Sequence, residues 1–275
     1  MNWRRLRLGL LTVTGLARRG FFIPYRYADS IATRQATYVE IATLFHKHEP
    51  AFAQTLEVID QFAAPLVAFS DPPPAPRWAQ DWFPRADGAT AYAMVRHHKP
   101  ARIVEVGSGH STRFMAQAVA DGNFPCTITA IDPAPRATID ALPVRVVRQP
   151  VQVVDDDVFA TLAAGDVLFI DSSHILMPGT DVDVLFNRIL PRLPAGVSVH
   201  IHDVFLPDDY PASWGWRGYN EQLAVAALLQ GGGFAPLWAS HYAATRMKEA
   251  VDASVLARLP LPSGGIESSV WLRKL

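Results

Sequence analysis

The 275-residue sequence predicts an α/β fold, in which a doubly wound, mostly parallel sheet of seven strands follows a helical N-terminal extension. Three observations support this prediction. From residue 101 onward, short apolar runs alternate with segments of helical periodicity. Four prolines between Ser70 and Pro76 separate this part from the helical stretch before it. Several apolar runs end in glycine, aspartate or histidine, which places polar groups at one edge of the sheet.

Composition sets limits on the kind of protein. Hydrophobic residues make up 49% of the chain, which is enough to bury the core of one large domain or of one domain with an appendage. The formal net charge is -1, so nothing electrostatic points to nucleic acid as a partner. A lone cysteine, Cys126, cannot form an internal disulfide. We therefore expect a cytoplasmic protein that does not bind nucleic acid.

The N-terminus has features of a short signal peptide. Arginines at positions 4, 5 and 7 precede an apolar run over 8–17. That run is close to the lower length limit, Arg18 and Arg19 follow it directly, and no small-x-small cleavage site is present. It is also too short to span a bilayer, which takes ~20 apolar residues. We expect no transmembrane segment and a short helix packed on the body of the protein. An amphipathic helix lying on a membrane surface is the alternative.

The next part of the chain is helical in pattern. Apolar residues recur at helical spacing from Asp29 onward, and Asp29 or Ser30 can cap the start of a helix. A second helix is expected over 51–69, where the proline run stops it. The sequence thus predicts a helical region with a proline-rich linker over 1–87 and a single α/β domain over 88–275.

The α/β domain shows a regular alternation of strand and helix patterns. The expected strands are residues 102–106, 127–131, 144–147, 166–170, 197–201, 234–239 and 268–272. The expected helices are residues 88–98, 111–120, 158–163, 182–190 and 220–229. Apolar strands separated by helices are typical of a mostly parallel sheet that is covered on both faces. Ligands of such sheets bind beyond the carboxyl ends of the strands.

A glycine-rich loop joins the first expected strand to its helix. The segment 104–112 reads Val-Glu-Val-Gly-Ser-Gly-His-Ser-Thr. Gly107 and Gly109 permit a sharp turn and a close approach to a ligand, and the helix N-terminus beyond them offers free N–H groups. A dinucleotide-binding fingerprint needs a third glycine where Thr112 stands, and a phosphate-binding Gly-Lys-Ser/Thr motif is absent. The loop resembles the Rossmann type and suits a carboxylate or a phosphate.

Two carboxylates accompany this loop. Glu105 lies just before the first glycine, and Asp132 ends the second strand, where a carboxylate can accept hydrogen bonds from ribose hydroxyls. Each has a structural alternative: Glu105 as a salt-bridged strand residue, and Asp132 as a turn former before Pro133. Their combination with the two glycines favours a nucleoside ligand.

These residues resemble the class I S-adenosylmethionine-dependent methyltransferases. Glu-Val-Gly-Ser-Gly at 105–109 is similar to the first motif of that family, and Ala-Ile-Asp at 130–132 to the second. The resemblance implies S-adenosylmethionine as cofactor, with its methionine near the glycines and Glu105, its ribose near Asp132, and its adenine near 149–157. The cofactor-binding residues expected on this basis are Glu105, Gly107, Ser108, Gly109, Ser111, Thr112 and Asp132.

A second group of polar residues follows the fourth and fifth strands. Asp171 and His174 come after one, and His202 and Asp203 end the other. Such a cluster can bind a hard divalent cation through its carboxylates, or supply a general base near neutral pH. In the alternative interpretation the two aspartates only cap turns, and His202 hydrogen-bonds to them from behind.

The resemblance extends to this second group. Metal-dependent O-methyltransferases of the macrocin type have an acidic residue after strand four and an acidic pair, or Asp-Asn, after strand five. Asp171 matches the first position, whereas the pair is replaced by His202 and Asp203. The resemblance implies Mg²⁺ or another divalent cation bound by Asp171, His202 and Asp203, which would lower the pKa of an acceptor hydroxyl. The position of these side chains at the strand ends makes His174, His202 and Asp203 the candidate catalytic residues.

The aromatic segment 208–219 follows the fifth strand and contains Trp214, Trp216, Arg217 and Tyr219. These side chains suit stacking on a sugar or aromatic ring or a lid, and they suit equally a contact between subunits of a homo-oligomer. The expected function is O-methylation of a small or medium acceptor with a sugar-like or natural-product hydroxyl. Two rivals remain: an iron oxygenase with a facial triad, and a binding protein that retains the fold without catalysis.

Overall fold

A seven-stranded sheet forms the centre of the computed structural model, which describes residues 3–31, 37–70, 72–135 and 138–275. The strand order is β3-β2-β1-β4-β5-β7-β6. Strands β1 to β5 are parallel, and β7 runs antiparallel to both of its neighbours. The bounds are β1 Arg102–Val106, β2 Thr127–Ile131, β3 Arg145–Val147, β4 Val167–Ile170, β5 Ser198–Ile201, β6 Phe234–Ala239 and β7 Val270–Lys274. The predicted α/β, Rossmann-like fold is confirmed.

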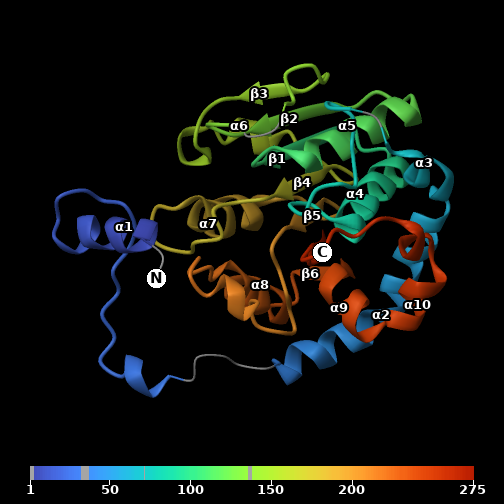
Figure 1. Cartoon of the computed structure of the whole chain (residues 1–275). Coiled ribbons are helices and arrows are strands. Elements are labelled where there is room, and N and C mark those ends of the chain that lie inside the picture. The colour runs from blue at the N-terminus through green and yellow to red at the C-terminus, as the bar shows by residue number, and fades with distance from the viewer. Residues whose placement is uncertain (1–2, 32–36, 71, 136–137) are drawn as a thin grey trace.

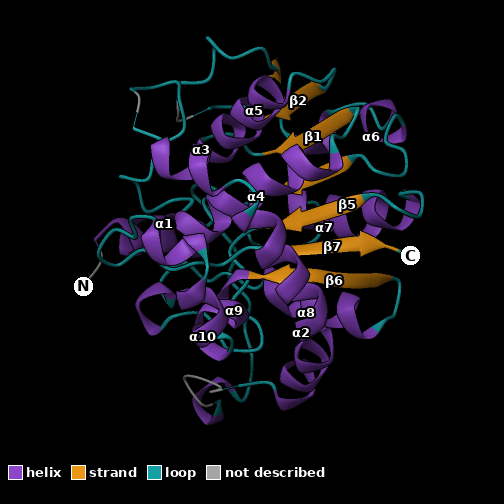
Figure 2. Cartoon of the chain, turned by 90° about the vertical axis from the view of Figure 1, so that its right-hand side faces the viewer, coloured by secondary structure: helices purple, strands orange, loops and turns teal. Residues whose placement is uncertain are grey.

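Helices surround this sheet, as Figures 1 and 2 show. Helices α4 and α5 pack against each other, and α2 packs against α4 and β6. Strands β4 and β5 are buried along their whole length, as expected for apolar strands covered on both faces. The helices are α1 Trp3–Val13, α2 Val39–Asp60, α3 Ala63–Ala68, α4 Arg85–His98, α5 His110–Gly122, α6 Asp157–Ala160, α7 Asp181–Val184, α8 Glu221–Gln230, α9 Ser240–Arg246 and α10 Lys248–Ala253.

The N-terminal helical region differs from the prediction. A single helix, α2, runs through Pro50, where two helices were expected. Proline removes one backbone hydrogen bond inside a helix. Phe45 and Phe52 lie on either side of Pro50, and both rings contact Tyr242 at centroid distances of 5.5 and 5.8 Å. Because both rings pack on Tyr242, the parts of the chain before and after Pro50 form one continuous helix. The last part of the helix expected over 51–69 is the separate short helix α3.

A second difference concerns the segment expected to be helical over 182–190. It begins as α7 and continues as a π-helical turn at Leu185–Ile189 and a 3-10 turn at Leu190–Arg192. Pro191 lies in the last turn and has no N–H to donate to a carbonyl one turn earlier. Two short helices of the C-terminal part, α9 and α10, were not predicted.

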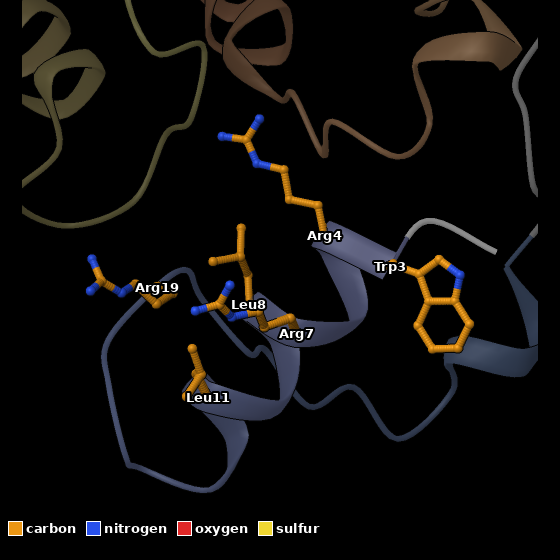
Figure 3. A pocket seen from close by; sticks show the side chains of 6 residues that line it. All are labelled: Trp3, Arg4, Arg7, Leu8, Leu11 and Arg19. Carbon is orange, nitrogen blue, oxygen red and sulfur yellow. The ribbon is translucent and has the colours of Figure 1, made fainter.

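Helix α1 lies at the edge of the molecule (Figure 1) and buries none of its residues. The prediction that it packs on the body is therefore wrong, because its most apolar face points outward. A hollow of about 500 Å³ borders α1, lined by Trp3, Arg4, Arg7, Leu8, Leu11 and Arg19 (Figure 3). No helix in the described part of the chain is long and apolar enough to cross a membrane.

The boundary expected between 87 and 88 falls within α4, which begins at Arg85. Contacts cross this boundary. Thr55 in α2 donates a hydrogen bond of 2.8 Å to the carbonyl oxygen of Leu237 in β6. Trp78 of the linker is buried and lies 4.9 Å from the ring of Phe114 in α5. The division into two regions stays a prediction, but their apolar side chains share one core.

Candidate active site

The glycine loop is fixed between the ends of β1 and β4. Gly107 has a φ of +81°, a conformation that side chains rarely adopt. The N–H of Gly107 donates a hydrogen bond of 2.9 Å to the carbonyl oxygen of Ile131. The N–H of Asp171 donates one of 2.8 Å to the carbonyl oxygen of Val106. A β-carbon on Gly107 would meet the Asp171 carbonyl oxygen, whereas one on Gly109 would meet nothing within 4 Å. Gly107 thus faces protein, and Gly109 borders open space.

Asp132 holds the loop from the next strand. Its Oδ2 atom accepts hydrogen bonds from the backbone N–H and the hydroxyl of Ser108, at 3.0 and 2.8 Å. Its Oδ1 atom accepts from the N–H of Ala134 at 2.8 Å. The structure therefore brings two of the expected cofactor residues together, at the edge where β1 and β2 end. Contact of Asp132 with a ribose stays a prediction.

Glu105 supports the loop from inside the protein. Its carboxyl oxygens accept hydrogen bonds from the hydroxyls of Ser111, at 2.5 Å, and Thr112, at 2.7 Å. Thr112 Oγ1 also accepts the N–H of Gly109 at 2.9 Å. Burial, opposed by these hydrogen bonds and assisted by the charges of Asp171 and Asp132, raises the pKa of Glu105 to about 8. All three side chains are buried, so they shape the backbone of the loop.

The second predicted group gathers around His174. The Nε2 atom of this histidine lies 3.4 Å from Asp171 Oδ1 and 3.3 Å from Asp203 Oδ2. Its Nδ1 atom lies 2.8 Å from Oε2 of Glu221, the first residue of α8. His174 and Asp203 both have positive φ, of 60° and 55°. The ends of β4 and β5 thus direct two carboxylates onto one buried imidazole.

Both nitrogens of this imidazole face carboxylates, which favours its cationic form. Burial alone would lower the pKa of His174, but the hydrogen bonds with Asp171 and Glu221 and the charges of Asp203 and Glu221 outweigh it. The pKa is raised well above the ordinary value. A histidine that keeps its proton at neutral pH is a poor general base. The geometry therefore favours a charged, positioning role for His174.

His202 lies beside Asp203 but makes its shorter contacts with other residues. Its Nε2 atom lies 3.0 Å from the carbonyl oxygen of Trp82 and 3.6 Å from Asp203 Oδ1. Its Nδ1 atom lies 3.3 Å from the hydroxyl of Ser269, to which His200 is also hydrogen-bonded. His202 therefore connects the end of β5 to the linker before α4 and to β7.

The expected metal ligands do not form a cation site. Asp171 and Asp203 both face the His174 ring, and His202 faces Trp82 and Ser269. Among the residues that the structure describes, no group of three or more His, Cys, Asp or Glu side chains has a geometry that could hold a metal ion. The donor set does not fit a divalent cation, and it does not fit the iron triad of the rival interpretation.

Sequence reasoning missed two acidic residues of this region. Glu221 pairs with His174 across a separation of 47 residues, and Asp87 in α4 accepts the backbone N–H groups of Ser268 and Ser269. Both carboxyls are buried. Glu221 stands in the first turn of an expected helix, where an acidic residue is common, so nothing in the pattern singled it out.

The aromatic segment covers one side of His174. The ring of Tyr219 lies 4.6 Å from the imidazole, and the guanidinium of Arg217 lies 3.7 Å from the centre of the Trp214 ring. Trp216 is exposed. The segment therefore closes over the buried histidine and presents an aromatic surface beside it. Its roles in binding an acceptor or another subunit stay predictions.

Part of the chain is similar to known proteins. Residues 104–204 match a family model described as "Methyltransferase domain". A methyltransferase from Podospora anserina, PaMTH1, bound to S-adenosylhomocysteine (SAH), is 16% identical, with 93% of this chain and 99% of that chain covered and a TM-score of 0.44. The N-methyltransferase NodS from Bradyrhizobium japonicum, in complex with SAH, is 12% identical, with 78% and 98% covered and a TM-score of 0.45. No curated protein sequence matches the chain.

Proposed function

We propose that this chain is a class I S-adenosylmethionine-dependent methyltransferase and that it methylates a hydroxyl oxygen of a small or medium acceptor, such as a sugar-like or natural-product alcohol. The observation that carries this proposal is the position of Asp171. It directly follows β4, its backbone carbonyl oxygen lies against Gly107 of the glycine loop, and its side chain is 39% exposed. The loop and the polar cluster therefore meet at this residue.

The cofactor half of the proposed site is the segment 107–109 with Asp132. No atom lies within 4 Å of a β-carbon placed on Gly109, and the methionine part of S-adenosylmethionine is proposed to lie on this side of the loop. The oxygens of Asp132 bind Ser108 and Ala134, and a carboxylate oxygen keeps further lone pairs for ribose hydroxyls. When bound, the cofactor supplies an activated methyl group, so the protein has to orient the acceptor and remove its proton.

Asp171 is the proposed acceptor of that proton. Of the three carboxylates around His174 it is the accessible one, because the side chains of Asp203 and Glu221 are only 11% and 1% exposed. The His174 ring, whose Nε2 atom lies 3.4 Å away, fixes the orientation of the Asp171 carboxyl group. An acceptor hydroxyl hydrogen-bonded to Asp171 would lose its proton to this carboxylate as the new carbon–oxygen bond forms.

We propose that the charge of His174 takes the place of a divalent cation in this site. The two aspartates that would bind a metal both face its Nε2 atom. Activity should then be insensitive to chelators. Trp216 and the stacked pair of Arg217 and Trp214 provide the surface on which the acceptor ring would lie.

The test is a methylation assay with S-adenosylmethionine and a panel of hydroxyl-bearing and amine-bearing acceptors, scored by mass and by SAH release. We expect methyl ethers, no effect of EDTA, and a loss of kcat of about 10²–10⁴-fold in Asp171→Asn. SAH affinity should be unchanged in that variant. Products formed only from amines, or full activity in Asp171→Asn, would contradict the proposal.

A further inference from the structure

A cluster of basic side chains lies at the start of α5, directly after the glycine loop. Arg113 is only 3% exposed, and its Nη2 atom donates to the carbonyl oxygen of Thr138 at 3.1 Å. Its Nε and Nη1 atoms are buried and have no hydrogen-bond partner within the described residues. The same is true of Arg77 Nε and His110 Nδ1. Four buried nitrogen atoms in one place are thus left without partners.

The charges of this cluster act on one another. Burial and the neighbouring charges of Arg113 and Arg77 lower the pKa of His110 to about 4, and Asp81 opposes them weakly. Burial and Arg77 also lower the pKa of Arg113. His110 is therefore neutral at pH 7, and its ring can donate a hydrogen bond from one nitrogen. The two guanidinium groups keep their charge.

Such an arrangement is costly unless an anion completes it. Buried nitrogen donors are nearly always hydrogen-bonded, and a buried charge without a partner destabilises the fold. His110 is the first residue of α5, so the partial positive charge of the helix N-terminus adds to the cluster. Gly109, directly before it, borders open space through which a ligand can approach.

We propose that Arg77, His110 and Arg113 form a carboxylate-binding site. The carboxylate belongs either to the methionine part of the cofactor or to the acceptor, and this assignment of its source rests on the proposed function. A guanidinium group offers two parallel N–H donors that match the two oxygens of a carboxylate. In Arg113 the unpartnered Nε and Nη1 atoms lie on opposite sides of the guanidinium, and each forms such a pair only with Nη2, which has two hydrogens and donates one to Thr138.

The first experiment needs neither cofactor nor acceptor. We expect sodium acetate to raise the Tm of the wild-type protein above that in sodium chloride of equal ionic strength, and to leave the Tm of Arg113→Gln unchanged. Arg258→Gln, at an exposed arginine of a distant turn, is the control and should behave as wild type. An equal acetate response in wild type and Arg113→Gln would overturn the site even if the methyltransferase proposal stands.

Calorimetry and kinetics then identify the source. If the cofactor supplies the carboxylate, Arg113→Gln loses about tenfold in affinity for SAH and nothing for 5′-methylthioadenosine, which lacks the carboxylate. If the acceptor supplies it, SAH affinity is unchanged and KM rises about tenfold for acidic acceptors alone. A variant that binds SAH and acidic acceptors as tightly as wild type refutes the proposal. Wild type that responds to acetate but binds no SAH refutes the proposed function instead.

A different observation supports a second proposal, at the N-terminus. Trp3, Leu6, Leu10 and Val13 recur at helical spacing on one face of α1, and their exposed fractions lie between 39% and 72%. Phe21, Phe22 and Ile23 form a second exposed apolar group after the helix. This outward apolar surface is unusual, because a helix of a globular protein normally buries its apolar face.

Arginines flank both apolar groups. Between residues 3 and 31 the chain has six arginines and, as its acidic residue, Asp29. The arginines are Arg4, Arg5, Arg7, Arg18, Arg19 and Arg26. Arg4, Arg7 and Arg19 border the hollow beside α1 (Figure 3). A helix with Trp and Leu on one face and arginine beside it suits the interface of a membrane that carries anionic lipids.

We infer that α1 and residues 21–23 dock on an anionic lipid surface. We expect the full chain to sediment with vesicles of phosphatidylglycerol and phosphatidylcholine, and at least tenfold less with phosphatidylcholine alone. A double variant, Trp3→Ser with Leu10→Ser, should stay in solution, whereas Leu223→Ser, at an exposed leucine of α8, should bind as wild type. Equal binding to both vesicle types overturns the inference, as does a dimer of the free protein that the double variant abolishes.

Discussion

A β-carbon on Gly107 would lie 2.1 Å from the carbonyl oxygen of Asp171, so the cofactor loop and the proposed proton acceptor are in direct backbone contact. The positive φ of Gly107 adds strain to any substitution there. We expect Gly107→Ala to lower the free energy of unfolding by roughly 3 kcal/mol and to displace Asp171. Urea unfolding and the methylation assay measure the two effects. Gly109→Ala has no such clash and should unfold like wild type.

Protonation of Glu105 leads to a prediction about pH. Its pKa in the folded protein is about 8, above its value in the unfolded chain, so the folded state holds this proton more tightly. The unfolded chain loses the proton near pH 4.5. The contribution of Glu105 to stability therefore falls as pH rises from about 4.5 to about 8 and is constant above. Glu105→Gln, which resembles the protonated carboxyl group but cannot ionise, should flatten this part of the pH profile in urea unfolding. An unchanged profile would contradict the assignment.

Replacement of His174 tests its charge. His174→Gln leaves Asp171, Asp203 and Glu221 without their shared cation and should cost roughly 3–5 kcal/mol of stability. The raised pKa of His174 means that its contribution is complete below pH 6.5 and is lost as pH rises through the folded-state value. The difference in urea unfolding between wild type and variant should therefore shrink at alkaline pH. A difference that grows with pH would show that the histidine is neutral.

Asp132 is expected to contribute to cofactor affinity. Asp132→Ala removes the acceptor for Ser108 and the proposed partner of the ribose, so we expect at least a tenfold loss in SAH affinity by calorimetry. Asp140→Ala is a matched control, because Asp140 follows the same strand, is exposed and pairs with Arg148 at 2.7 Å. Equal SAH affinity in both variants would remove Asp132 from the cofactor site.

The local pattern of apolar residues was sufficient to predict the strands of the sheet. Strands β1, β2 and β6 begin and end at the predicted residues, because each apolar run is bounded by residues that break a strand. The meeting of Gly107, Asp132 and Asp171 followed from the rule that parallel strands end at one edge. The predicted α1 was correct as a helix and wrong in its packing, since periodicity identifies an apolar face but not what covers it.

Side-chain partners in the cluster could not be predicted in this way. The pairing of His174 with Glu221 depends on how α8 folds back over the end of β4, which no local spacing encodes. The orientation of His202 toward Trp82 depends on the path of the proline-rich linker. These two pairings determine whether Asp171 and Asp203 face a metal ion or the His174 ring. The sequence therefore predicted which residues gather in the cluster, but not which of them bind one another.

The packing of α2 has a consequence for any shortened version of the chain. Phe52 lies edge-on to Trp238 at a centroid distance of 6.3 Å, and Thr55 is bonded to the carbonyl oxygen of Leu237. Removal of everything before the proline run would take this cover away and expose the rings of Trp238 in β6 and Tyr242 in α9 to water. The smallest fragment able to fold by itself should therefore be much longer than the matched stretch 104–204, and should retain α2.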